Sequence, residues 1–179
     1  MGLGKDYAGQ NCLLARTLEV VGERWTLLVV RDAFYGVRRF GDFLAHLDVP
    51  RAVLADRLET LVRASVLAKH RYQEAPPREE YLLTEAGAEL WPALFILSGW
   101  GERHLGGASS RVFRHVDCDG VLVGTGTCAD CGAVVPPGDL VVELSPGATF
   151  LRTDRVSVAL RQPHRLLEPL FPAAASVGG

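Results

Sequence analysis

The stretch RRFGDFLAHLDVPRAVLADRLETLV, residues 38–62, decides how the first half of this chain folds. Apolar side chains recur at helical spacing as far as Leu47. Asp48 and Pro50 then interrupt the pattern. A second helix is expected to begin here, because proline is tolerated in the first turn of a helix, where its missing N–H costs little. Two short helices therefore meet at a tight turn.

The second of these helices separates its side chains into two faces. The inward face is apolar and consists of Val53, Leu54, Leu58, Leu61 and Val62. The outward face is polar or small and consists of Arg51, Ala52, Ala55, Asp56, Glu59 and Arg63. This amphipathic pattern predicts one buried stripe and leaves an exposed surface that begins with an arginine.

The flanking sequence adds helices before this pair and a hairpin after it. Residues 12–36 have helical spacing with one break, and residues 68–84 change to the two-residue alternation of a ribbon around a proline-containing loop. Thr84 is expected to cap one long final helix over residues 85–105, kinked at Pro92. The order helix, helix, turn, helix, ribbon is that of a winged helix-turn-helix, in which the helix after the turn lies in the DNA major groove.

The segment from residue 38 to residue 71 is locally basic, although the formal net charge of the chain is −2. Its arginine and lysine residues are Arg38, Arg39, Arg51, Arg57, Arg63, Lys69 and Arg71. Its acidic residues are Asp42, Asp48, Asp56 and Glu59. A chain with this net charge has no overall attraction to nucleic acid, so any such binding must come from a local patch.

Three blocks of the sequence carry a family resemblance. They are NCLLARTLEVVGERWTLLVVRDAFYGVRRFGDF, VLADRLETLV and HRYQEAPPREEYLLTEAG, in this order. Together they resemble the HxlR-type branch of bacterial winged-helix regulators, relatives of the MarR-like proteins, across residues 10–105. The resemblance implies a homodimeric transcription factor, expected to be a repressor, that binds an inverted repeat in double-stranded DNA. It also implies a response to small reactive compounds or metabolites.

The outer face of the second helix carries the residues expected to read bases. Arg51 can make a bidentate contact to guanine, worth about 1–3 kcal/mol of discrimination. The alternative is that Arg51 is simply a solvated first-turn arginine. Ala52 and Ala55 are expected to lie against a thymine methyl group or to allow close approach of the backbone.

Arg38 and Arg39 precede the first helix of the turn, where side chains and helix amides together suit phosphate. We expect these two arginines to position the protein on DNA rather than to specify its sequence.

The ribbon carries a further basic set. Lys69 and Arg71 share one strand face and are expected to meet phosphate, although alternating charge is normal on an exposed strand. Arg78 lies at the ribbon tip and is expected to reach a minor groove or a phosphate. The alternative for Arg78 is an ion pair with Glu79 or Glu80.

The final helix carries more apolar side chains than one narrow seam can bury, among them Trp91, Phe95 and Trp100. A twofold partner would cover this surplus, so we expect a homodimer with two reading helices about 34 Å apart. The alternative is that the C-terminal part of the chain covers this helix.

Cys12 occupies the position where the resembled family often has an oxidant-sensing cysteine. A sensor needs exposure and a lowered pKa. The alternative is that Cys12, beside Leu13 and Leu14, is a small buried hydrophobic residue.

GGASS, residues 106–110, is a stretch of small residues and marks the expected domain boundary. We expect a winged helix-turn-helix domain for DNA binding and dimerisation over residues 1–106, and a small module with a C-terminal tail over residues 111–179. The predicted fold class is therefore mainly α with a β-wing, followed by a β-rich, zinc-ribbon-like module. Past Gly147 a strand followed by a short helix is expected.

The module contains HVDCDGVLVGTGTCADCG, which holds three of the four cysteines of the chain. His115 and Cys118 form one pair and Cys128 and Cys131 a second, each separated by two residues, as in turns that present two donors to one tetrahedral zinc ion. We expect one structural zinc ion per chain, with Asp117 or water as the alternative to the histidine. The other interpretations are a dithiol redox pair and a metal-free cluster.

Several functional classes find no support in the sequence. It has no Ser/His/Asp order, phosphate-cradling glycine loop or H-E-x-x-H helix, so we do not expect an enzyme. It has no run of about 18 apolar residues and no signal-peptide core at its N-terminus, so we expect a cytoplasmic protein without membrane association. The alternative functions are a metal-stapled adaptor, whose basic face would bind protein partners, and a thiol redox protein.

Overall fold

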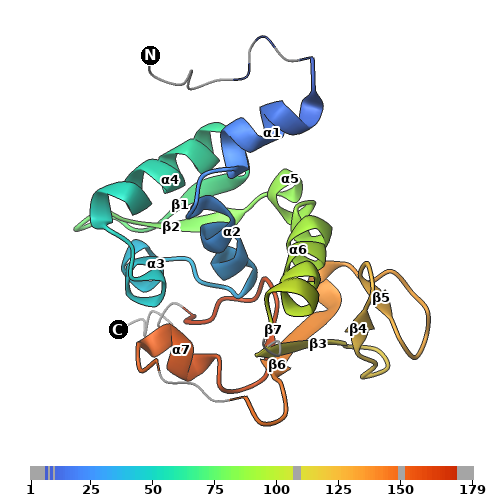
Figure 1. Cartoon of the computed structure of the whole chain (residues 1–179). Helices are drawn as coiled ribbons and strands as arrows, with labels where there is room; N and C mark the ends of the chain where they lie inside the picture. Colours follow the sequence, from blue (N-terminus) through green and yellow to red (C-terminus); the bar gives the residue numbers. More distant parts are fainter. Residues whose placement is uncertain (1–6, 8, 10, 107–109, 149–151, 173–179) are drawn as a thin grey trace, which may run out of the picture.

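The computed structural model describes residues 7, 9, 11–106, 110–148 and 152–172 (Figure 1). Its first part contains α1 (Leu13–Val21), α2 (Thr26–Phe34), α3 (Phe40–Leu47), α4 (Arg51–Arg63), β1 (Leu67–Gln73), β2 (Arg78–Leu83), α5 (Glu85–Ala88) and α6 (Trp91–Leu105). Its second part contains β3 (Arg111–His115), β4 (Leu122–Val123), β5 (Thr127–Cys128), η1 (Pro137–Asp139), β6 (Leu140–Leu144), α7 (Arg155–Ala159) and β7 (His164–Arg165). This order confirms a winged helix-turn-helix followed by a strand-rich region.

The turn between α3 and α4 forms as the sequence predicts. Asp48 ends α3 in the left-handed region, at φ 53°, and its amide donates to the carbonyl of Leu44. Pro50 occupies the cap position of α4, so the helix begins at Arg51. The inner side chains of α4 that have no exposed surface are Leu54, Leu58 and Leu61. This stripe anchors α4 and leaves its other face free.

β1 and β2 pair as an antiparallel hairpin, the wing, in a register that sets Leu67 opposite Leu83. The hairpin is tied to the helices because the amide of Tyr81 donates to the carbonyl of Arg38 at 2.7 Å. In Figure 1 the wing extends beneath α4 and toward the same side of the molecule as the start of that helix. The first residues of α4 and the wing therefore point in a common direction.

The expectation of one long, kinked final helix is wrong. Thr84 does cap a helix, since its hydroxyl oxygen accepts from the amide of Gly87, but this helix, α5, has only four residues. The helix is interrupted after Ala88, and α6 starts at Trp91 with Pro92 in its first turn. The reason is that proline has no N–H to donate and clashes with a preceding turn of helix, so it fits at a helix start and not in an interior.

The second part of the chain is built on an antiparallel sheet in the order β3, β6, β7, with the small β4–β5 hairpin beside it (Figure 1). The expected order of strand and then helix in the tail is reversed, because α7 precedes β7. The start of α7 is fixed by Asp154, whose carboxylate accepts from both the amide and the hydroxyl of Ser157. Residues 149–151 of the expected strand lie outside the described residues.

The two parts of the chain share one hydrophobic core. Trp91 of α6 makes an edge contact with Phe113 of β3, with ring centroids 4.9 Å apart. The segment after β7 returns to the connection between α2 and α3, where the amide of Leu170 donates to the carbonyl of Gly36 at 3.0 Å. The C-terminal segment thus contacts the backbone that leads into the helix-turn-helix.

The predicted boundary at residues 106–110 falls partly on residues 107–109, which lie outside the described part of the chain. The division into residues 1–106 and 111–179 therefore stays a prediction. Both parts contribute residues to one hydrophobic core.

Candidate nucleic-acid interface and metal centre

The outer face of α4 is open to solvent along its length. Its exposed residues are Arg51, Ala52, Ala55, Asp56, Glu59 and Arg63. The guanidinium of Arg51 lies 5.1 Å from the centroid of the Phe40 ring, so the first residue of α4 contacts the first residue of α3. The structure thus places the three predicted base-reading residues on one exposed surface.

The two arginines before α3 have different surroundings. The guanidinium of Arg39 lies 4.9 Å from the ring centroid of Tyr72, so this side chain bridges the start of α3 and the wing. Arg38 is half-buried, and its Nη2 donates to the carbonyl of Leu167 at 3.0 Å. Arg38 therefore holds the C-terminal segment, a role that the sequence did not indicate.

Two basic residues of the wing are exposed but paired. Lys69 Nζ lies 3.4 Å from a carboxylate oxygen of Glu79, and Arg71 Nη1 lies 3.3 Å from one of Glu74. Exposed pairs of this kind are worth about 0–1 kcal/mol, so they can open at little cost when a phosphate approaches.

Arg78 is exposed at the start of β2. Its two alternative partners both have other contacts: Glu79 pairs with Lys69, and Glu80 lies 3.1 Å from Nδ1 of His70. Arg78 therefore lies next to the loop of the wing and forms an ion pair with neither Glu79 nor Glu80.

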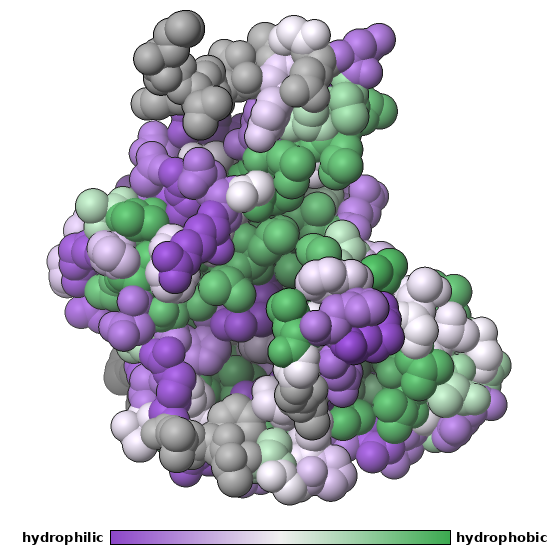
Figure 2. Space-filling model, viewed as in Figure 1, coloured by the Kyte–Doolittle hydropathy of each residue, from purple (hydrophilic) through white to green (hydrophobic). Residues whose placement is uncertain are grey.

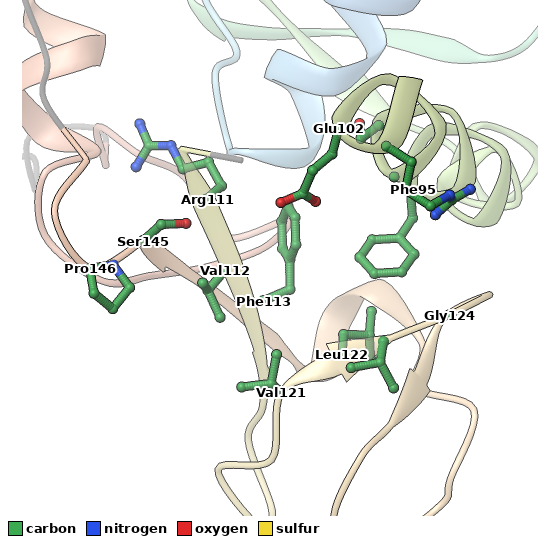
Figure 3. A pocket seen from close by; sticks show the side chains of 14 residues that line it. Phe95, Glu102, Arg111, Val112, Phe113, Val121, Leu122, Gly124, Ser145 and Pro146 are labelled. Carbon is green, nitrogen blue, oxygen red and sulfur yellow. The ribbon is translucent and has the colours of Figure 1, made fainter. Parts of the chain in front are cut away.

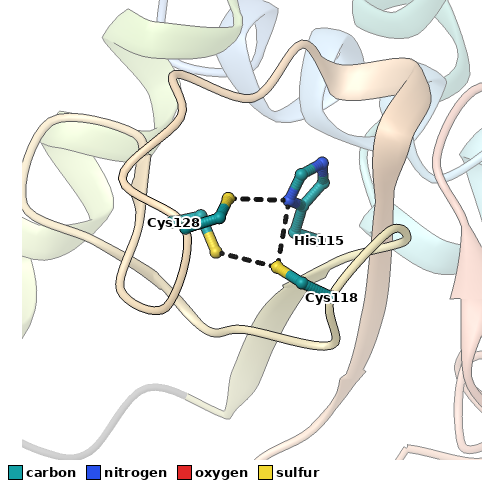
Figure 4. A group of neighbouring side chains, drawn as sticks. His115, Cys118 and Cys128 are labelled. Carbon is teal, nitrogen blue, oxygen red and sulfur yellow. Dashed lines mark hydrogen bonds between the residues drawn. The ribbon is translucent and has the colours of Figure 1, made fainter.

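Four side chains of the second part converge in one cluster (Figure 4). They are His115 at the end of β3, Cys118, Cys128 at the end of β5, and Cys131. Cys118 Sγ lies 3.3 Å from Nδ1 of His115 and 3.4 Å from Sγ of Cys128. Cys131 Sγ lies 3.4 Å from the same Nδ1, and all four donor atoms lie within 4.8 Å of one another.

The dimensions of this cluster suit one tetrahedral metal ion. Bonds of about 2.3 Å to sulfur and about 2.0–2.1 Å to nitrogen separate neighbouring donors by about 3.5–3.8 Å in a tetrahedron. The contacts of 3.3 and 3.4 Å are close to these edges. The arrangement is therefore compatible with metal binding as the structure stands.

The backbone of two similar turns explains the convergence. The residue after each second ligand is left-handed, with φ 59° at Asp119 and φ 72° at Gly132. The amide of Asp119 donates to the carbonyl of His115 at 2.8 Å, and that of Gly132 to the carbonyl of Cys128 at 3.0 Å. Gly120 completes the site, because a Cβ there would lie 2.5 Å from Sγ of Cys128.

Hydrogen bonds shift the pKa values of two thiols in opposite directions. The amide of Cys131 lowers the pKa of Cys128 to about 6, with help from the amide of Asp130 and against desolvation. At Cys118 the amide of Gly120 lowers the pKa, but the Cys128 thiol and desolvation outweigh it and raise the pKa to about 11. Amide donors of this kind stabilise a thiolate, the form in which cysteine binds metal.

Asp117 is the alternative to His115 as the fourth donor. Its Oδ2 instead lies 3.6 Å from Nε2 of His115, on the side of the ring away from the thiols. A carboxylate in this position orients a metal-bound imidazole through its other nitrogen. The geometry therefore favours Nδ1 of His115 as the fourth donor.

A buried carboxylate that the sequence analysis did not single out joins α2 to α3. Asp32 has no exposed surface, and its Oδ1 accepts from Nη2 of Arg31 at 2.7 Å, while its Oδ2 lies 2.7 Å from Nδ1 of His46. Because a buried charge is costly unless paired, these contacts hold the two helices together. The available signal was the position of Asp32 three residues after Val29, on the apolar face of its helix.

An exposed apolar surface lies on α1 and α6, and we call it the α1/α6 surface. Its residues are Leu13, Leu14, Leu18, Ile96, Leu97, Trp100 and Leu105. Figure 2 shows hydrophobic side chains running from α1 toward the middle of the molecule. Because β3 packs against α6 through Phe113, the second part of the chain covers one side of that helix and leaves this other side exposed.

Two cavities flank the contact between α6 and β3. The larger, of about 470 Å³, lies between α6 and strands β3 and β4, and Figure 3 shows Glu102 reaching from α6 toward Phe113 at its edge. The smaller, of about 270 Å³, lies between α2, α6 and β3. Phe95, Ser98 and Phe113 line both cavities.

The model of the HxlR-like helix-turn-helix family matches residues 20–109, half of the chain. The chain belongs to the HxlR-like helix-turn-helix family. It is 39% identical, over 147 residues, to the uncharacterized HTH-type transcriptional regulator Rv3095 of Mycobacterium tuberculosis (strain H37Rv), a match that covers 81% of this chain and 92% of that protein. It is 30% identical to the uncharacterized regulator YdeP of Bacillus subtilis (strain 168), over 57% of this chain and 83% of that protein.

A solved structure of PA1607, a protein assigned as a transcription factor, superimposes with a TM-score of 0.56 at 32% identity, covering 80% of this chain and 96% of that one. This HxlR-like chain is therefore a DNA-binding helix-turn-helix transcriptional regulator. The similarity to Rv3095 and PA1607 extends past residue 109, where the family model ends, into the C-terminal region. No helix in the described part of the chain has the length and apolar composition needed to cross a bilayer.

Proposed function

We propose that this HxlR-like regulator acts as a homodimeric repressor on an inverted-repeat operator, with α4 of each protomer in successive major grooves. The observation that carries this proposal is the division of α4 into a fully buried stripe and an exposed face that begins at Arg51. A helix that lies in the major groove needs such a free face, and its first residues are the ones that reach base edges.

The proposed contacts follow from these positions. Arg51 reads guanine, with Ala52 and Ala55 against thymine methyl groups or close to the backbone. Arg39, at the start of α3, contacts phosphate.

In the wing, Lys69 and Arg71 exchange their acidic partners for phosphate, and Arg78 reaches the adjacent minor groove or backbone. Arg38 was expected to contact phosphate as well. Its bond to the carbonyl of Leu167 supports a positioning role, in which it fixes the C-terminal segment beside α3.

The α1/α6 surface supports a homodimer. Seven large apolar side chains are exposed on these two helices, more than the scattered few that a monomer exposes. A twofold contact through this surface would bury it and leave both α4 helices free to reach one face of a duplex.

We propose that one zinc ion per chain occupies the cluster of His115, Cys118, Cys128 and Cys131. Three thiols and one imidazole are donors typical of structural zinc, and four protein donors leave no position for a reactive water. The ion would hold the end of β3 and the β4–β5 hairpin together. Binding free energy would in this way stabilise the β4–β5 hairpin, whose strands have only two residues each.

The regulator would act in the cytoplasm, where a bacterial operator lies, and respond to a small molecule or oxidant. Cys12 is exposed at the cap position of α1, which supports access by an oxidant and does not support the alternative of a buried hydrophobic residue. We assign no catalytic role to any residue.

Selection of bound fragments from the source genome, followed by footprinting, tests the proposal. We expect an inverted repeat with half-sites one helical turn apart, about 10 base pairs centre to centre, or a multiple of that spacing. Equal binding of all fragments would overturn sequence-specific recognition. Protection of a single half-site would overturn the homodimer.

A further inference from the structure

The region beyond the family model carries a basic surface beside α3, which we call the α3/α7 surface. It consists of the exposed residues Arg152, Arg155 and Arg161. Residues 152–172 contain four arginines and only two carboxylates, those of Asp154 and Glu168, so this segment is basic although the formal net charge of the chain is −2. A local excess of charge of this kind indicates an anionic partner.

Two of these arginines are fixed against α3. Nη2 of Arg152 donates to the carbonyl of Ala45 at 3.1 Å. Nε of Arg155 lies 3.4 Å from Oδ1 of Asp42 in the first turn of α3, and its guanidinium lies 3.7 Å from the ring centroid of Phe171. Side chains that are already held lose less conformational freedom when they bind a ligand, so these arginines suit a binding surface.

The carboxylates that pair with these two arginines lie beneath them. The side chain of Arg155 is 53% exposed, whereas that of Asp42 is 7% exposed. The side chain of Arg152 is 50% exposed, whereas that of its partner Asp154 is 12% exposed. The face that these pairs present to solvent is therefore positive, and an approaching anion meets guanidinium groups before it meets a carboxylate.

Positive charges also outnumber the carboxylates around α3. Desolvation raises the pKa of Asp42, and the charges of Arg155 and Arg39 both act against it, so two arginines share this one carboxylate. Arg161 forms no ion pair with any residue that the structure describes, and its Nη2 donates to the carbonyl of Arg152 at 3.2 Å. The surface therefore keeps positive charge that no carboxylate of the described residues balances.

The α3/α7 surface continues the surface proposed to contact DNA. In Figure 1 the loop of the wing, the start of α4, α3 and α7 follow one another down the left side of the molecule. Arg155 reaches the end of α3 that Arg39, the proposed phosphate contact, precedes. A duplex that lies against α4 and Arg39 would therefore extend toward α7.

We propose that the α3/α7 surface binds the phosphate backbone of the operator, next to the phosphates held by Arg39, so that the C-terminal region adds directly to DNA affinity. This inference rests on the proposed function, because it takes α4 to lie in the major groove. Arginine makes bidentate, charge-assisted hydrogen bonds to phosphate. Such contacts add affinity and fix the orientation of the protein without reading bases.

The test measures the affinity of the full-length dimer for its selected operator by fluorescence anisotropy over a range of salt concentrations. A triple variant, Arg152→Gln with Arg155→Gln and Arg161→Gln, removes the three charges. Each phosphate contact contributes about 0.9 to the slope of log affinity against log salt, and the dimer has two copies, so we expect the slope to fall by about two units or more. Relative affinities for single-base variants of the operator should stay as in the wild type.

Arg165→Gln is the matched control in the same region. The side chain of Arg165 is 42% exposed, but it pairs at 3.1 Å with Asp139, whose side chain is 47% exposed, so its charge is balanced at the surface. This variant should keep the slope of the wild type. An unchanged slope in the triple variant, or an equal fall in the triple variant and in Arg165→Gln, overturns the proposal. The first of these results is also the one expected if the surface binds an acidic protein instead of DNA.

Two further variants separate a phosphate contact from mere support of α3. Asp42→Asn removes the carboxylate and keeps Arg155, so DNA affinity should be retained or rise, whereas Arg155→Gln should lower it. Equal losses in these two variants would mean that the ion pair only holds α3 in place. Arg161→Gln breaks no ion pair among the described residues, so it tests the surface even if the triple variant fails to fold, and an unchanged slope in it would count against the proposal.

Failure of this proposal is distinct from failure of the proposed function. If the triple variant keeps the slope of the wild type while Arg39→Ala lowers it, only the α3/α7 surface is disproved. If the wild type binds all sequences equally, the proposed recognition by α4 is disproved, whatever the slope of the triple variant.

Discussion

Nε of Arg155 in α7 lies 3.4 Å from Oδ1 of Asp42 in α3, so the C-terminal region of the chain is joined to the first helix of the helix-turn-helix. The same guanidinium lies 3.7 Å from the ring centroid of Phe171. Nearby, Nη2 of Arg152 donates to the carbonyl of Ala45 at 3.1 Å. The region beyond the family model thus forms part of the support for the DNA-reading helices.

The docking of the C-terminal segment depends on Gly36. This residue has φ +80°, and a Cβ there would lie 1.8 Å from the carbonyl oxygen of Glu168. Gly36→Ala should therefore displace the segment and lower the free energy of unfolding by about 2 kcal/mol or more, measured by urea denaturation. The matched control is Gly41→Ala in α3, where a Cβ meets no atom within 4 Å. Gly41→Ala should raise stability by up to about 1 kcal/mol, and equal effects of the two changes would contradict this docking.

Asp154 should make stability depend on pH. Desolvation raises its pKa, but hydrogen bonds from Ser157 and the nearby His46 and Arg152 outweigh it, so the pKa is lowered on folding. The stability it contributes is therefore present above the unfolded pKa of about 3.9 and lost as pH falls through the lower folded value. Asp154→Ala should cost about 1 kcal/mol at pH 7 and less as the carboxyl becomes protonated. Asp154→Asn, which keeps a capping oxygen, should retain most of the stability, and an Asp154→Ala loss that is constant with pH would disprove the linkage.

Trp100 belongs to the α1/α6 surface proposed as the dimer contact and is 50% exposed in the single chain. Trp100→Glu should weaken dimerisation by about 2 kcal/mol or more, close to thirtyfold in the dissociation constant, because a charge would be buried in an apolar contact. Sedimentation equilibrium measures the change. Val134→Glu, at a valine that is 80% exposed in the C-terminal region, should leave the dimer intact. Equal dissociation constants for the dimers of both variants would mean that the dimer contact does not include Trp100.

The zinc content should depend on the cysteines of the cluster and not on Cys12. Protein prepared under reducing conditions should contain one zinc ion per chain, with bonds of about 2.3 Å to sulfur and about 2.0–2.1 Å to nitrogen in X-ray absorption. Cys128→Ser should lose the ion, and a chelator should destabilise the wild type but not this variant. Cys12→Ser should keep one zinc ion per chain. Wild-type protein without metal would disprove the proposed zinc site.

The helix pair, the wing and the cysteine cluster could be predicted because each depends on short-range spacing. Each of these features is encoded by residues close together in the sequence: the apolar stripe of α4, the alternation in β1, and the two-residue gap between Cys128 and Cys131. The sequence also indicated an irregularity near Pro92, but it predicted a kink inside one long helix, whereas the structure has two helices, α5 and α6, and Pro92 lies in the first turn of the second.

The long-range contacts could not be predicted in this way. Arg38 resembles any arginine that precedes a helix, and its partner, the carbonyl of Leu167, is 129 residues away. The place of Asp32 on the apolar face of its helix indicates burial, but its partner His46, 14 residues further along the chain, could not be identified from the sequence. The cavity beside Trp91 exists only because β3 packs on α6, which no local pattern encodes.

The proposed recognition of DNA requires that Arg51 of each protomer reads a base while Arg39 contacts phosphate. The most direct test of these two contacts measures affinities over a range of salt concentrations. Wild type, Arg51→Ala and Arg39→Ala are compared on the operator and on its single-base variants. Arg63→Ala, at the far end of the same exposed face of α4, is the control. We predict that Arg51→Ala loses about 1–3 kcal/mol of discrimination at one base pair per half-site, whereas Arg39→Ala weakens all sequences alike and lowers the salt dependence by about one unit per protomer. Full discrimination at every position in Arg51→Ala would contradict base reading by Arg51.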